Sequence, residues 1–132
     1  MAYYYGINSK KSFQIRVKES NINNGLSENF TIQDIKLIPG MYQIQGWRVL
    51  NFGNGIPEAA FGMSSYDEGI GNFYPDTTRA DNFIEVLHCD TITNEVEGRF
   101  QVFMGKYGGP STLPGVPDSV FLTEGKFYLK IK

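Results

Sequence analysis

Apolar and polar side chains alternate along much of this chain, and this period of two is the feature that most restricts what it can fold into. The clearest run covers residues 95–104. Its apolar or small residues occupy every second position: Val96, Gly98, Phe100, Val102 and Met104. Residues 13–18 repeat the pattern, with Phe13, Ile15 and Val17 set against Gln14, Arg16 and Lys18. Because successive side chains of a strand point to opposite faces, each run predicts a strand with one buried face.

The alternating runs are short, are separated by Gly, Pro and Asn turns, and nowhere give way to a sustained helical period. Residues 19–29 have room for a single helical turn. The pattern predicts an all-β fold of about eight to ten short strands. We expect a single β domain over residues 1–132, a usual length for one domain. A β-sandwich is favoured, and an open or closed antiparallel β-barrel is the alternative.

Local irregularities refine this prediction. The alternation that starts at Phe30 slips phase at residues 34–37, as a β-bulge or bend would cause. Residues 64–81 form the longest irregular region. Residues 82–89 set two groups on opposite faces: Phe83, Glu85, Leu87 and Cys89 against Ile84, Val86 and His88. Glu124 and Gly125 predict a tight hairpin turn between residues 120–123 and 126–131, with Gly125 supplying a positive φ.

Charge and cysteine content exclude several classes of function. The net charge is -2 and the 12 Lys and Arg residues are scattered, which argues against a nucleic-acid partner or a membrane attracted by charge alone. One Cys leaves no internal disulfide, four-cysteine zinc site or CxxC redox pair. No apolar stretch is long enough for a transmembrane helix. We expect no cofactor.

The single His and the single Cys are neighbours, His88 and Cys89. Adjacent residues of a strand point to opposite faces, so these two cannot form a nucleophile–base pair with each other. A strand Cys is usually a small buried apolar residue. Neither Ser64 nor Ser65 lies in a nucleophile-elbow motif. We therefore expect no catalytic residue and no enzyme activity.

Acidic residues gather in the long irregular region. Asp67, Glu68, Asp76 and Asp81 offer the hard oxygen ligands that calcium prefers. Their spacing matches no EF-hand loop, so solvated acids on a surface loop are the favoured interpretation and the calcium site is a weak alternative. The same acids would have to serve a hydrolase, and the separation of two catalytic carboxyls cannot be deduced from sequence.

Aromatic residues flank the same loops. Flat rings on the loops of a sandwich can stack on sugars or grip a peptide, and acidic side chains beside them can orient the ligand. The expected binding residues lie in the Trp47–Phe52 and Tyr66–Asp81 loops: Trp47, Phe52, Tyr66, Asp67, Tyr74, Asp76 and Asp81. Core packing is the competing interpretation for Trp47. The expected partner is an unidentified protein or glycan.

The C-terminal third carries a motif cadence. A strand at residues 82–86 ends near Asp90-Thr91, a Val-x-Gly-x-Phe strand follows at residues 96–100, and Thr123-x-Gly125-x-Phe127 closes the sequence. This cadence, over residues 82–131, resembles uncharacterised cell-envelope lipoprotein domains of bacteria. The resemblance implies a secreted or lipid-anchored β domain in the cell envelope or outside the cell. It brings no catalytic residues. The aromatic start at Tyr3-Tyr4-Tyr5 looks like the middle of a strand, so we expect a leader, with its signal or anchor, outside residues 1–132.

Three functions follow, in order. The first is a non-catalytic extracellular or cell-envelope β-sandwich that binds a ligand or has a structural role. The alternative is a lipocalin-like β-barrel that carries a small molecule, and the third is a hydrolase using the acidic loop. A closed apolar cavity of several hundred cubic ångströms would favour the carrier. An exposed aromatic strip over a solid core would favour the surface binder, and two carboxyls converging on one cleft would favour the hydrolase.

Overall fold

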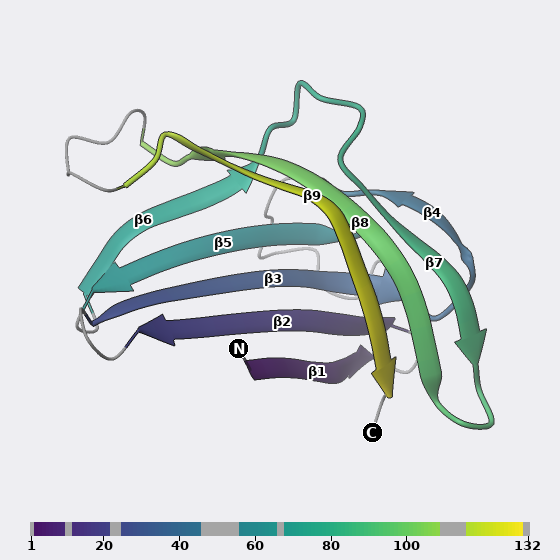
Figure 1. Ribbon diagram of the computed structural model, residues 1–132. Coiled ribbons are helices and arrows are strands. Elements are labelled where there is room, and N and C mark those ends of the chain that lie inside the picture. Colours follow the sequence, from purple (N-terminus) through teal and green to yellow (C-terminus); the bar gives the residue numbers. More distant parts are fainter. Residues whose placement is uncertain are drawn as a thin grey trace.

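The computed structural model describes residues 2–9, 12–21, 25–45, 56–65, 68–108 and 116–130, with the backbone alone at residues 2–9, 21 and 68. These residues form strands and turns, and the described ranges contain no helix. Figure 1 shows the strands in chain order: β1 (Ala2–Ser9), β2 (Ser12–Asn21), β3 (Leu26–Lys36), β4 (Gly40–Gln43), β5 (Glu58–Ser65), β6 (Glu68–Pro75), β7 (Phe83–Asp90), β8 (Glu95–Lys106) and β9 (Ser119–Lys130). The expected all-β fold is confirmed.

All nine strands belong to one antiparallel sheet, in the order β1-β2-β3-β5-β6-β8-β7-β4 with β9 added to β8. Strand β8 organises this sheet. Along its first half it pairs with β7, and at Met104–Lys106 it pairs with β6. Strand β9 pairs with β8 over nearly its full length and therefore occupies the opposite edge. The sheet stays open, because no pairing joins β9 to β1.

The sheet bends so that its two halves pack face to face (Figure 1). Strands β2, β3 and β5 form one layer, and β7, β8 and β9 cross it at a steep angle as the other, as in orthogonal sheet packing. Aromatic contacts join the layers: the ring centroids of Phe13 and Phe127 are 6.2 Å apart, and those of Phe30 and Phe100 are 5.5 Å apart. The sandwich-like core therefore lies between halves of one open sheet.

The core is built from the inward positions of both layers. The first layer supplies Phe13, Ile15, Phe30, Ile32, Ile35, Ala59, Phe61, Met63 and Phe73, and the second supplies Ile84, Val86, Val96, Val102, Met104, Phe127 and Leu129. The alternation predicted for residues 13–18 and 95–104 is confirmed, since these strands bury one face. Within the described ranges there is no helix long and apolar enough to cross a membrane.

The predicted phase slip in β3 is a β-bulge. Phe13 pairs with Ile35 and Ile15 pairs with Ile32, so β3 holds one more residue than β2 across this step. Asp34 takes up the irregularity with a φ of 60° and is fully buried. The bulge lets Ile32 and Ile35 both reach the core although three positions separate them.

Two other expectations about irregular segments were wrong. Residues 64–81 hold strand β6, which pairs with β5 from Glu68 to Phe73 and then with β8. Its sequence has a Gly at alternate positions, which hid the strand pattern. Of residues 19–29, the described part continues β2 to Asn21 and begins β3 at Leu26.

The predicted C-terminal hairpin was also wrong, because β9 is one continuous strand. A bulge interrupts its pairing with β8 between Phe100 and Val102, and Glu124 has the positive φ of 57°. The role of Gly125 is steric: a Cβ built there would lie 2.5 Å from the Phe100 ring. A Gly that looked like a turn residue is therefore a place where a ring rests on the backbone.

A bulge in β7 reverses the predicted faces of its last residues. The pairing with β8 shifts between Val86 and His88, which leaves Leu87 as the extra residue. Beyond it, Cys89 packs against the core on the side of Ile84 and Val86, and His88 is exposed. His88 and Cys89 still point in different directions, as expected.

One side of the layered structure is held shut. Gln45 forms a parallel bridge with Glu58, and its backbone N–H donates to the Pro57 carbonyl. The buried Gln33 side chain donates to Glu58 at 3.3 Å. The Ile44 N–H donates to the Asn82 carbonyl. These bonds join the end of β4 to β5, so the opening between the layers lies on the other side, towards β2 and β9.

Candidate functional site

An apolar cleft of about 620 Å³ lies between the two layers, where β9 faces β2, β3 and β5. Its walls are mostly aliphatic and aromatic. The inward side chains along it are Ile15, Val17, Phe30, Phe61, Phe100, Leu122, Phe127 and Leu129. A cleft of this size lies within the range of small-molecule sites. We call it the inner cleft.

The inner cleft follows from the strand registers. Val17 lies directly opposite Phe30, and Phe30 lies opposite Phe61, so three apolar side chains form a row across β2, β3 and β5. On the facing layer, the Phe100 ring stacks on Phe30 with an interplanar angle of 28°. Steeply crossed layers meet closely at one corner and separate at the other, and the row lies along this widening gap.

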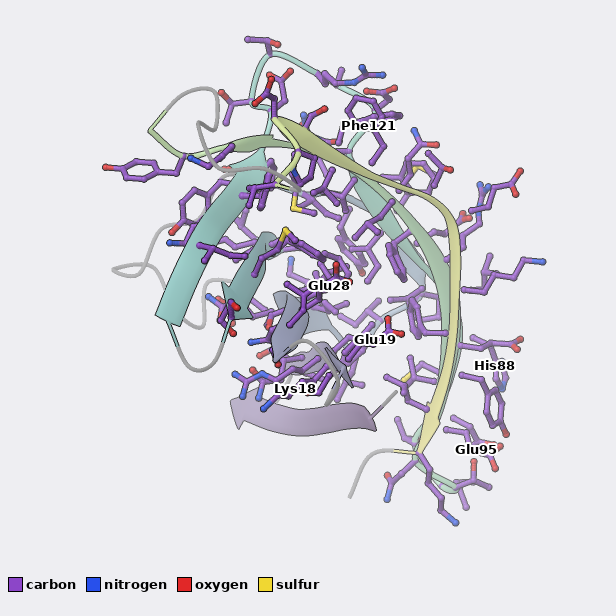
Figure 2. All side chains as sticks on the ribbon, turned by 60° about the vertical axis from the view of Figure 1, so that its left-hand side comes forward. Lys18, Glu19, Glu28, His88, Glu95 and Phe121 are labelled. Carbon is purple, nitrogen blue, oxygen red and sulfur yellow. The ribbon has the colours of Figure 1, made fainter. Side chains whose placement is uncertain are left out.

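Two glutamates continue the same inward positions towards the end of β2 and β3. Glu19 follows Val17 by two residues, and Glu28 precedes Phe30 by two. Glu19 and Glu28 are paired directly across the two strands, and both border the inner cleft. Figure 2 shows them on the side of the sheet that faces β9, with Lys18 on the opposite side. One end of the apolar cleft is therefore acidic.

The basic residues beside the cleft lie on outward positions of β9. Phe127 and Leu129 are buried, whereas Lys126, Tyr128 and Lys130 between them are exposed. These lysines border the cleft through the strand that carries them. The inward charges of its described walls are thus the two glutamates.

Of the binding residues expected from sequence, Trp47, Phe52, Tyr66 and Asp67 lie outside the described residues, and so does the side chain of Glu68. The other three, Tyr74, Asp76 and Asp81, lie at the end of β6 and in the following turn, away from the inner cleft. Tyr74 is half-buried and packs edge-on against Tyr107 at 5.8 Å.

The two described aspartates organise a local turn. The Thr78 hydroxyl and backbone N–H both donate to Asp76, which lowers the pKa of that carboxyl. Arg79 donates two hydrogen bonds to Asp81, at 2.9 and 2.8 Å, and they lower the pKa of Asp81. Among the described side chains, no three His, Cys, Asp or Glu groups gather as metal ligands would.

The turn is anchored by Asn82, which sequence reasoning missed. Its side chain is 1% exposed, accepts a hydrogen bond from the Phe103 N–H at 2.8 Å and donates to the Asp76 carbonyl at 3.1 Å. Arg79 lies 3.6 Å above the Phe103 ring. These contacts tie residues 76–82 to β8 and give the turn a structural role.

The His88 and Cys89 pair offers no reaction centre. His88 lies on the exposed face of β7 and points away from the interior (Figure 2). Burial and the charge of Asp90 raise the pKa of the Cys89 thiol, which disfavours the reactive thiolate. The two side chains also diverge, which leaves neither able to activate the other.

Sequence reasoning treated the lining residues as core, and it did not consider a cleft. One signal was present: Glu19 and Glu28 occupy the phase of buried neighbours in two adjacent alternating runs. A charged residue at an inward position marks a place where a layer is not closed over.

Comparisons with protein-family models, with curated proteins and with solved structures found no match for this chain.

Proposed function

We propose that this protein is a non-catalytic binding protein that holds a small, largely apolar molecule in the inner cleft. The observation that carries the proposal is the cleft itself, with about 620 Å³ of space between walls of Val17, Phe30, Phe100 and Leu122. Of the functions expected from sequence, this is the small-molecule carrier, with an open cleft in place of a closed cavity.

The apolar walls supply the affinity. Each Å² of apolar surface removed from water contributes roughly 25 cal/mol, so covering the aromatic row with a ligand is favourable. The bound molecule would replace water against Phe30, Phe61 and Phe100. Phe13 and Phe127 close the deep end by packing against each other.

Binding is better supported than hydrolysis. Glycoside hydrolysis needs carboxyls on both sides of the bond that breaks. Glu19 and Glu28 stand side by side on one wall, and the facing wall presents Phe127 and Leu129. The arrangement orients a charge and does not flank a substrate bond.

A location in the cell envelope or outside the cell belongs to the same proposal. Its support is the resemblance of residues 82–131 to bacterial envelope lipoprotein domains. Fractionation of the source cells, followed by immunodetection of the chain, tests it: the protein should appear in envelope or extracellular fractions.

A fluorescence titration tests the binding proposal. Phenylnaphthylamine, a neutral apolar dye, should bind saturably with enhanced emission. Leu122→Trp fills the cleft and should weaken binding by about tenfold or more, a loss of about 1.4 kcal/mol. Leu87→Trp makes the same change at an exposed position of β7 and should leave binding unaltered. Equal affinities for the two variants, with both folded by circular dichroism, would contradict the proposal.

A further inference from the structure

We infer that the inner cleft selects amphipathic molecules with a cationic head group, an alkylammonium or aromatic ammonium, held with the head against Glu19 and Glu28. This inference rests on the proposed function and adds the chemical class of the ligand. It is carried by the position of two inward carboxylates at the end of an apolar cleft.

The two carboxylates have no cationic partner in the described part of the chain. The ion pairs there are Arg79–Asp81 and Arg99–Glu85, and both lie elsewhere. Like charges placed directly opposite on neighbouring strands destabilise a sheet. The pair thus costs stability at inward positions where alternation calls for apolar residues, as expected at a site kept for binding.

The surrounding charges leave the acidic end uncompensated from within. On β2, Arg16 and Lys18 are exposed on the face opposite to Glu19. On β9, Lys126 and Lys130 alternate with the buried Phe127 and Leu129 and point outward. A cation entering the cleft therefore meets the two carboxylates and no inward basic group of these strands.

The neighbouring aromatic rings favour the same head group. Phe30 is two residues from Glu28 on the same face of β3, and it stacks on Phe100. Aromatic faces attract ammonium groups, and quaternary ammonium is a common ligand of such rings. An apolar tail extending towards Ile15 and Phe127 would lie along the aliphatic part of the cleft.

Competition against bound phenylnaphthylamine tests the inference with three probes of equal chain length: dodecyltrimethylammonium, dodecanol and dodecanoate, each below its micellar concentration. The ammonium should compete best and the carboxylate worst. Glu19→Gln and Glu28→Gln should each weaken the ammonium about two- to fivefold, as expected for partly exposed charge pairs. Added salt should reduce the preference. Glu97→Gln, an exposed acid on β8, is the matched control and should change nothing.

The outcomes separate the two proposals. If dodecanol and the dye bind but dodecanoate competes as well as dodecyltrimethylammonium, the cleft is an apolar site and the inference is wrong. An ammonium preference that survives Glu19→Gln with Glu28→Gln also overturns it. If neither dye nor dodecanol binds, the proposed function fails and the inference fails with it.

Discussion

The ring of Phe100 rests on the backbone of Gly125, its direct partner across β8 and β9. The next pair along the ladder inverts the arrangement, with Gly98 on β8 under the ring of Phe127 on β9. Both rings belong to the contacts that join the layers, to Phe30 and to Phe13. The glycines thus bring β9 close enough to β8 for its partners to line the inner cleft.

Gly125→Ala should lower the free energy of unfolding by about 1–3 kcal/mol, because the added methyl group overlaps the Phe100 ring. Gly105→Ala is the matched control in β8. No atom lies within 4 Å of a Cβ built there, so it should cost nothing or stabilise slightly. Urea unfolding of the two variants measures the difference. Equal stabilities would show that the ring does not occupy this position.

Asn82→Ala should destabilise the protein by about 1–3 kcal/mol, since it removes the acceptor of the buried Phe103 N–H bond and the donor to Asp76. Asn72→Ala, at an exposed position of β6, should stay within about 0.5 kcal/mol of the wild type. Thermal or urea unfolding of both measures this. A loss as large for Asn72→Ala would argue against the anchoring role of Asn82.

Glu28→Gln should raise the free energy of unfolding by about 0.2–1 kcal/mol, because it relieves the like-charge pair with Glu19. The gain should shrink at high salt, where the repulsion is screened. Urea unfolding at low and high salt measures both effects. A loss of stability on substitution would mean that Glu28 has a stabilising partner, against the account of the cleft.

Acid should weaken the fold. Hydrogen bonds from the Ile92 and Thr93 N–H groups lower the pKa of Asp90 below its ordinary 3.8, and Thr78 lowers the pKa of Asp76. A carboxyl with a lower pKa in the folded state contributes stability above its unfolded pKa and loses it as the pH falls through the folded value. Stability should therefore decline below about pH 5.

The variant Asp90→Asn keeps the acceptor oxygen and removes the titration. Its unfolding free energy should fall less steeply with decreasing pH than that of the wild type. Urea unfolding at a series of acidic pH values compares the two slopes. Identical slopes would show that Asp90 does not contribute to the acid dependence.

Much of the fold could be predicted because burial follows alternation. Residues 13–18 and 95–104 bury the expected side chains, and the phase slip after Phe30 marked the bulge at Asp34. Both errors in β7 and β9 came from single residues. The bulge at Leu87 is set by pairing with a distant strand, and Gly125 looks the same in sequence whether it makes a turn or lies under a ring.

The candidate site could be predicted much less well. Whether Val17, Phe30 and Leu122 fill a core or line a cleft depends on how far two halves of a sheet separate, which no local pattern encodes. The expected Asp76 and Asp81 hold a turn together. Polar loop residues serve local geometry as readily as ligands, so loop chemistry alone did not locate the cleft.

The most direct measurement is a methyl-resolved NMR titration of the protein with phenylnaphthylamine. The account predicts saturable shifts at Ile15, Val17, Leu122 and Leu129, which line the inner cleft, and none at Leu87 or the 92% exposed Ile92. Shifts confined to Leu87 and Ile92, or no saturable shift at any of these methyl groups, would contradict it.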